Sequence, residues 1–253
     1  MSQFALYRDP IVLDSVEHRD FRLVAPTDHT MASGMHACFL AAGEFAPASR
    51  EYAIVFVRDP VDGQPQWQPI VMLGVSAGEN LFVEAAAGSP WNARYVPAYI
   101  RRYPFWTAQL PGLENTAVMI DRGWKGFSRT EGEPLYEPDG KPAARLVEAM
   151  GFLEQFEVQA DNTLAVCRRL AEFELLREMT ANATLADGST LALNGFFVVD
   201  EAKLRALPDA QVIELHRSGA LGLVHAHLAS LGNLQALLER KAQRLAGHGA
   251  PTP

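Results

Sequence analysis

Positions 74–78 read Gly-Val-Ser-Ala-Gly, the G-x-S-x-G pattern of a hydrolase serine held on a sharp turn. A hydrolase of this kind also needs a histidine base, and His216 follows Ser76 in a workable order. The pattern is informative only where the serine lies between a strand and a helix. Residues 69–75 have the composition of a strand, but residues 79–83 have that of a turn and another strand. The sequence therefore favours an ordinary turn at Ser76 and leaves a serine hydrolase using Ser76 and His216 as the alternative.

The remaining polar residues do not suggest a metal or cofactor site. His225 and His227 are two positions apart on a predicted helix, so their rings point to opposite sides, whereas helical ligands need a spacing of three or four. Glu131 and Glu133 could form an acid/base pair, but they lie in a loop rich in glycine and proline, where solvated acids are common. The phosphate loops G-x-x-x-x-G-K-S/T and G-x-G-x-x-G do not occur. We therefore expect no metal and no cofactor.

The densest unusual feature is the 91–106 segment, which holds six aromatic residues and three arginines in sixteen positions. Such side chains are typical of recognition hot spots, because they bury a large area and offer hydrogen-bond donors. In the alternative interpretation, the aromatic rings cover the sheet and the arginines pair with the surplus acids. The candidate binding residues are Trp91, Arg94, Tyr95, Tyr99, Arg101, Arg102, Tyr103, Phe105 and Trp106.

Length, charge and composition exclude several classes of protein. The chain has 253 residues, of which 48% are hydrophobic, so it can bury the core of one large domain or two small ones. Its net charge is −8 and its basic residues form no block, which disfavours nucleic-acid binding. The amino terminus does not have the composition of a secretory signal, and the most apolar tract, 220–238, is interrupted by polar residues and predicts no membrane span. Only two cysteines occur, without metal-site spacing, so we expect a cytoplasmic protein.

The elements that must position these residues indicate an α+β fold. Short runs of β-branched and aromatic residues predict strands at 52–57, 69–75, 81–84 and 116–121, hence an antiparallel meander over about residues 36–121. Apolar residues then recur every three or four positions after Pro142, which predicts a central helix of about 35 residues. Further along, Asp187-Gly188 predicts a β-hairpin between 179–185 and 190–199. C-terminal helices are expected at 202–207, 209–218 and 220–244.

The distribution of proline and glycine suggests how the chain is divided. Residues 131–142 contain three prolines and two glycines and form the best candidate linker. This predicts a mostly β part at 1–130, a helical part with the hairpin at 143–246, and a frayed tail at 247–253. One continuous domain is the alternative.

Several stretches also resemble a known family when they are taken together. They are Glu44-Phe45, the run Arg-Glu-Tyr-Ala-Ile-Val-Phe at 50–56, Gly-Glu-Asn-Leu-Phe-Val at 78–83, Arg-Tyr-Val-Pro at 94–97, Arg-Arg-Tyr-Pro-Phe at 101–105, and the stretches 186–188, 195–201 and 215–221. Over most of its length the chain resembles the SapC family of bacterial proteins. This family takes its name from a surface-layer gene cluster, and its members are often labelled peptide-transport permeases, a label that the lack of predicted spans contradicts.

The resemblance implies an accessory role near TonB-dependent receptors in nutrient uptake, or near halogenase-like enzymes, and it supplies no catalytic residues. Our leading hypothesis is a non-enzymatic cytoplasmic binding or adaptor protein that uses the 91–106 segment. A hydrolase using Ser76 and a surface-layer accessory protein are the alternatives. A protein, a small molecule or a second copy of the chain could be the partner.

Overall fold

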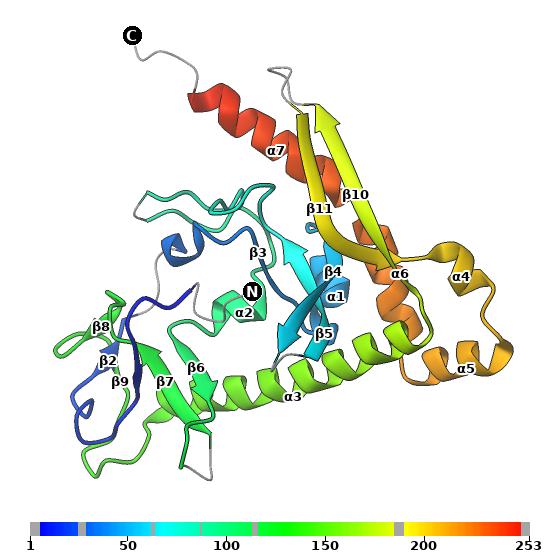
Figure 1. Cartoon of the computed structure of the whole chain (residues 1–253). Helices are drawn as coiled ribbons and strands as arrows, with labels where there is room; N and C mark the ends of the chain where they lie inside the picture. The colour runs from blue at the N-terminus through cyan, green and yellow to red at the C-terminus, as the bar shows by residue number, and fades with distance from the viewer. Residues whose placement is uncertain are drawn as a thin grey trace.

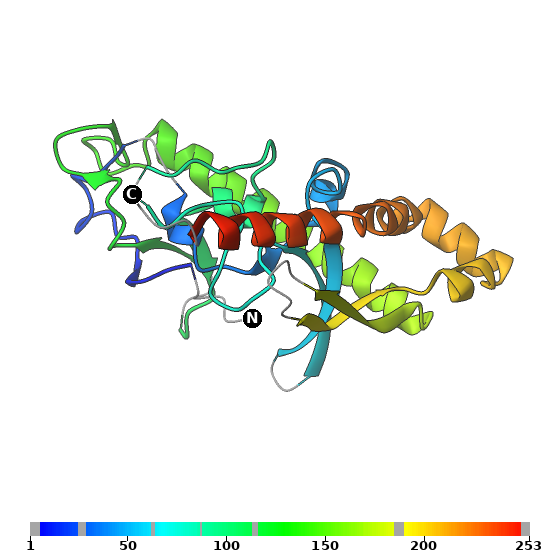
Figure 2. The same cartoon turned by 90° about the horizontal axis from the view of Figure 1, so that it is seen from above.

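The structure is a computed structural model that describes residues 6–24, 29–61, 64–86, 88–112, 116–184 and 190–248. Helices and antiparallel strands both contribute, which confirms the α+β class. Two small sheets lie at one end of the molecule, and the short helices α4 (Glu201–Arg205) and α5 (Asp209–Arg217) lie at the other (Figures 1 and 2).

The described residues form three antiparallel sheets, and the meander predicted over 36–121 is divided between the first two. The largest has the order β10-β11-β4-β5-β3, and its strands are β10 (Leu176–Thr184), β11 (Thr190–Val199), β4 (Ile54–Val61), β5 (Gln64–Met72) and β3 (Ala37–Phe39). A second sheet has the order β1-β7-β6, with β1 (Pro10–Val12), β7 (Ala117–Asp121) and β6 (Phe105–Ala108). The third has the order β8-β2-β9, with β8 (Phe127–Ser128), β2 (Arg22–Leu23) and β9 (Glu133–Pro134). The turn predicted at Asp187-Gly188 lies outside the described residues.

The strand predicted at 81–84 is wrong. Leu81, Phe82 and Val83 are buried, but they form turns instead of pairing with a strand. The side chain of Asn80 accepts a hydrogen bond from the Phe82 amide and donates one to the Ala32 carbonyl. The Phe82 amide is thus satisfied by a side chain, while the Leu81 amide donates to the Leu73 carbonyl and the Phe82 carbonyl accepts from the Asn92 amide, so the apolar run is buried without forming a strand.

Helix α3 (Ala144–Glu172) runs along the molecule past the sheets (Figure 1). Its 29 residues are fewer than the 35 expected. Leu146 and Leu153 pack into the cluster around the small sheets, Phe156 packs into the main core, and Leu170 packs into the cluster near α5. The spacing of three or four positions after Pro142 also includes Met150, but this side chain is 40% exposed. One helix therefore connects all three hydrophobic clusters.

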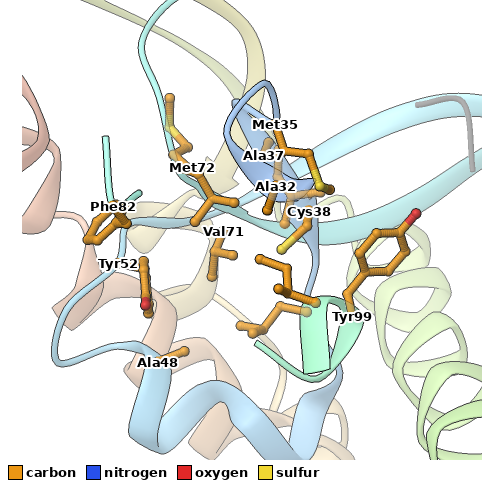
Figure 3. Close-up of a cluster of buried hydrophobic side chains, with 14 of the residues drawn as sticks. Ala32, Met35, Ala37, Cys38, Ala48, Tyr52, Val71, Met72, Phe82 and Tyr99 are labelled. Atoms are coloured by element: carbon orange, nitrogen blue, oxygen red, sulfur yellow. The ribbon is translucent and has the colours of Figure 1, made fainter. Parts of the chain in front are cut away.

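The main core lies between the five-stranded sheet and the helices around it. Figure 3 shows Val71 of β5 and Cys38 of β3 among the buried side chains, with Tyr52 on one side and Tyr99 on the other. This core also contains Phe156 and Leu234, which follow the linker predicted at 131–142. Since residues from both sides of that stretch share one core, we propose that the chain forms one continuous domain.

The C-terminal helices follow the expected signals except at one place. The Asp200 side chain accepts hydrogen bonds from the Ala202 and Lys203 amides and so caps α4, as expected for an acidic residue at this position. The helix predicted at 220–244 is instead two helices, α6 (Ala220–Ser230) and α7 (Asn233–His248). The side-chain Nδ2 of Asn233 donates to the Ser49 and Tyr52 carbonyls, which anchors the start of α7 on another part of the chain.

His227 joins α6 to the large sheet. Its Nε2 accepts from the Val199 amide at 3.0 Å, and its Nδ1 lies 2.8 Å from the Ile54 carbonyl oxygen, so the neutral ring carries its proton on Nδ1. Burial lowers the pKa of His227 from 6.5 to about 4, because the charged ring would lose its hydration. His225, two positions earlier, is exposed, as the helical spacing indicates.

We predict that His227 makes stability depend on pH. Between pH 6.5 and about 4 the unfolded chain binds a proton that the folded chain does not, so the free energy of unfolding falls as the pH drops through this window. His227→Gln keeps a donor and an acceptor but cannot titrate, so it should remove a pH-dependent contribution of about 3 kcal/mol. Urea unfolding at several pH values measures this. His225→Gln is the control, and an equal pH dependence in wild type and His227→Gln would contradict the prediction.

Candidate functional site

The 91–106 segment is mostly buried. Its short helix α2 (Ala98–Arg101) begins directly after Pro97, whose missing N–H is harmless there. Arg94 and Arg101 are exposed and Tyr95 is half-buried. The other candidate residues are buried, namely Trp91, Tyr99, Arg102, Tyr103, Phe105 and Trp106.

The tryptophans of the segment belong to the core. The Trp91 indole N–H donates to the Tyr52 hydroxyl at 2.7 Å, and its ring stacks on Phe82. The Trp106 ring lies 3.9 Å from the Tyr7 ring, measured between centroids. For these two residues the geometry supports the interpretation in which the rings cover the sheet.

The arginines behave differently, because two of them line a cavity. This cavity has a volume of about 300 Å³ and lies between the 91–106 segment and the first half of α3. Arg101 and Arg102 come from the segment, and Arg145 comes from α3. Aromatic rings form much of the remaining wall, namely those of Tyr103, Phe105, Trp124 and Phe152.

Arg102 is a buried cation, only 7% exposed. Its guanidinium carbon lies 4.2 Å from the Tyr99 ring centroid and 4.8 Å from that of Phe156, so the group is held between two aromatic faces. Its Nε has no hydrogen-bond partner, and no carboxylate of the described residues forms an ion pair with it. Burying a charge without an opposite charge is unfavourable, so Arg102, which also lines the cavity, carries a buried positive charge without an ion-pair partner among the described residues.

Arg101 is fixed in orientation while staying exposed. Its Nε donates to the Val96 carbonyl at 2.9 Å, and its guanidinium lies over the rings of Phe152 and Tyr95. No carboxylate in the described part of the chain forms an ion pair with it. The alternative in which these arginines pair with surplus acids is therefore not what the geometry shows for Arg101 and Arg102.

The α3 side of the cavity carries one ion pair. An Arg145 terminal nitrogen lies 3.1 Å from Glu148, and water reaches both side chains, which are 40% and 69% exposed, so the pair is weak. Sequence reasoning missed Arg145 and Phe152. In the sequence these two residues are marked only by their position in the first half of the predicted central helix. The helical pattern does not indicate that this helix packs beside the 91–106 segment.

Asp121 does not line the cavity, but it fixes Tyr103, which does. This carboxylate is fully buried and accepts hydrogen bonds from the amides of Arg8, Asp9 and Gly123 and from the Tyr103 hydroxyl at 2.9 Å. Burial, together with the hydrogen bond to Asp121, raises the pKa of Tyr103 well above its ordinary value, so the hydroxyl stays protonated and donates.

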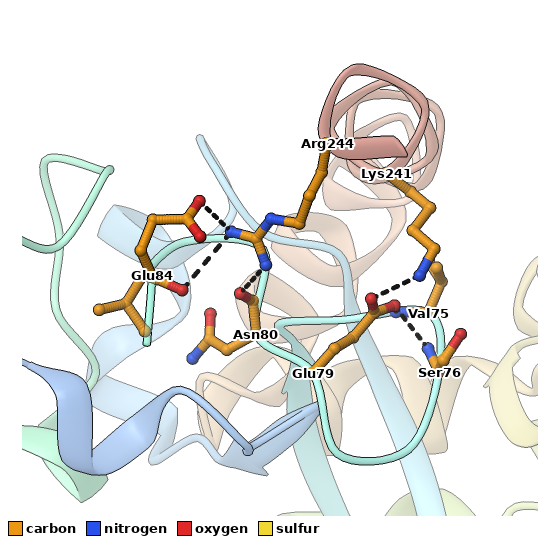
Figure 4. A network of polar contacts seen from close by, with 8 residues as sticks. Val75, Ser76, Glu79, Asn80, Glu84, Lys241 and Arg244 are labelled. Atoms are coloured by element: carbon orange, nitrogen blue, oxygen red, sulfur yellow. Dashed lines mark hydrogen bonds and ion pairs between the residues drawn. The ribbon is translucent and has the colours of Figure 1, made fainter. Parts of the chain in front are cut away.

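The loop that carries Ser76 does not form a nucleophile site. The amides of Val75 and Ser76 both donate to one carboxylate oxygen of Glu79, and the other Glu79 oxygen pairs with Lys241 of α7 at 2.6 Å (Figure 4). No helix follows the serine. His216 is exposed on α5, which lies away from α7 at one end of the molecule (Figures 1 and 2). Ser76 and His216 are therefore not brought together.

The described residues offer little else for chemistry. No three His, Cys, Asp or Glu side chains among them gather closely enough to hold a metal ion. None of the helices within the same ranges combines the length and apolar character needed to cross a bilayer.

Comparison with known proteins places the chain in a family. The SapC family model matches residues 13–237, which is most of the chain. The chain belongs to the SapC family. No curated protein and no solved structure matches it. The matched range of this SapC protein contains the whole 91–106 segment and the part of α3 that lines the cavity.

We predict that Asp121→Asn lowers the free energy of unfolding by about 2–4 kcal/mol, because the amide N–H₂ would face donors that now bind a carboxylate. Asp9→Asn is a matched control, since it changes only an exposed pair with Arg122 and should cost less than about 1 kcal/mol. Urea unfolding at neutral pH measures both. Equal losses in the two variants would show that the buried carboxylate has no special role.

We also predict that a fluorophosphonate probe labels the wild type and Ser76→Ala to the same low extent, because the Ser76 loop is built around Glu79 and no helix follows it. Gel fluorescence or intact mass measures the adduct. An adduct that forms in the wild type and is lost in Ser76→Ala would contradict this prediction and support a serine hydrolase that uses Ser76.

Proposed function

We propose that this SapC protein is a non-enzymatic binding or adaptor protein whose recognition site is the cavity between the 91–106 segment and α3. The observation that carries the proposal is that Arg101 and Arg102 line one cavity without a carboxylate partner among the described residues. Arginines near aromatic rings are typical of recognition sites, because a planar guanidinium can bind an acceptor and stack at the same time.

The cavity also has the features that a binding site needs and lacks those of a catalytic one. Its walls are formed by packed elements, since Tyr103 is fixed by Asp121 and Phe152 lies on α3. No pair of a nucleophile and a base lines it. The arginines can orient and hold an acceptor, and this supports capture over turnover.

We further propose that the protein acts in the cytoplasm, as an accessory to TonB-linked nutrient uptake or to a neighbouring halogenase-like enzyme. The compartment is inferred from the two unpaired cysteines, both of which are buried. The accessory role is inferred from the family.

Affinity capture from the native cell tests the binding role. We expect Arg101→Ala/Arg145→Ala to reduce the recovered partner at least about tenfold, because each arginine offers charge-assisted hydrogen bonds. The melting temperature should change by only a few degrees, since the Arg101 side chain is exposed and the Arg145 side chain is partly exposed. Bound proteins and co-purified small molecules are identified by mass spectrometry.

Arg94→Ala is the matched control. Arg94 belongs to the same segment and is exposed, but it does not line the cavity, and its amide, which bonds to Glu51, is unchanged by the substitution. Capture that is equal in all three proteins would contradict the proposed site. A large loss of melting temperature in the double variant would show that Arg101 and Arg145 are structural.

A further inference from the structure

The size of the cavity restricts what it can hold. Its volume of about 300 Å³ is at the lower end of the range of about 300–1,000 Å³ that small-molecule sites occupy. A peptide helix or strand needs a longer groove, so the dimensions fit a compact ligand or one side chain of a larger partner.

The charge of the cavity restricts the ligand further. Three arginines line it against a single acid, Glu148, which is paired with Arg145. Arg102 contributes a positive charge that is buried and has no ion-pair partner in the described residues. The positive charges lining the cavity outnumber the negative one, so occupancy by an anion is favoured over occupancy by a cation or a neutral molecule.

The rings in the wall indicate that the anion has an apolar body. Trp124 and Tyr103 pack edge to face with centroids 6.0 Å apart, and Phe152 lies beneath the Arg101 guanidinium at 5.2 Å. A bare inorganic ion would leave these surfaces in contact with water, whereas a flat organic group would cover them. The guanidinium fork matches the two oxygens of a carboxylate or of a phosphate.

We infer that the cavity binds a small organic anion, with its carboxylate or phosphate group at the arginines and an aromatic or apolar body against the rings of Tyr103, Trp124 and Phe152. The inference rests on the proposed function, because it assigns a ligand class to the same recognition site. It extends that function by requiring that the ligand bind by itself, without a macromolecule attached.

Titration of the full-length chain with four probes tests the inference. Benzoate and phenyl phosphate carry both the anion and the ring, benzyl alcohol carries the ring without the charge, and inorganic phosphate carries the charge without the ring. Trp124 in the wall provides a fluorescence signal, and calorimetry gives an independent reading. We expect benzoate or phenyl phosphate to bind at least about tenfold more tightly than either single-feature probe. The preference between the two distinguishes a carboxylate ligand from a phosphate ligand.

Variants show where the probe binds. Arg101→Ala/Arg145→Ala should weaken binding of the preferred anion at least about tenfold, whereas Arg94→Ala should leave it unchanged. Phe152→Leu should weaken binding of the ring-bearing anions and leave inorganic phosphate unaffected. It preserves most of the apolar volume of a half-buried residue, so the protein should remain folded.

The outcomes separate the two proposals. If neither benzoate nor phenyl phosphate binds more tightly than benzyl alcohol and inorganic phosphate, or if no probe binds, the small-anion inference is overturned. If partner capture still depends on Arg101 and Arg145 in that case, the proposed function stands and the cavity receives a side chain of a macromolecule. Anion binding that persists in the arginine double variant also overturns the inference, since the probe would then bind elsewhere.

Discussion

The buried carboxylate of Asp121 is the constraint on which the rest of the site depends. A fully buried charge is tolerated only when its acceptor positions are filled, and this one receives hydrogen bonds from Arg8, Asp9, Gly123 and Tyr103. Meeting this requirement holds the amino-terminal arm beside β7 and brings Tyr103 to the same point. The short chain that follows Tyr103 then has a fixed path into β6, and this path forms one wall of the cavity.

The opposite wall of the cavity is formed by α3, whose position is fixed because its side chains pack into three hydrophobic clusters. Leu146 and Leu153 are buried near the small sheets, and Leu170 is buried at the far end of the helix. A straight helix pinned in this way cannot move toward or away from the 91–106 segment. The side chains of Arg145 and Phe152 are therefore presented to the segment by the packing of residues that do not themselves touch a ligand.

The 91–106 segment combines two roles that composition does not separate. Trp91 and Trp106 bury their rings in the core, which stabilises the segment, and the same stabilisation holds Arg101 in place at the surface. Tryptophan, tyrosine and arginine are frequent both in cores near a surface and in recognition sites, because each joins a large apolar area to a polar tip. For this reason the pattern did not separate the residues that pack into the core from those that line the cavity.

The sequence by itself determined the features that depend on neighbouring residues: the α+β class, the cap at Asp200 and the lack of a helix after Ser76. Each follows from local backbone preferences and short-range hydrogen bonds. Only the tertiary structure decided that Arg145 and Arg101 line one cavity, which of the two oppositely facing histidines, His225 or His227, is buried, and that Leu81 is buried without joining a sheet. These outcomes depend on contacts between residues distant in sequence, whose energies arise from the burial of area and charge and leave no periodic signal in the chain.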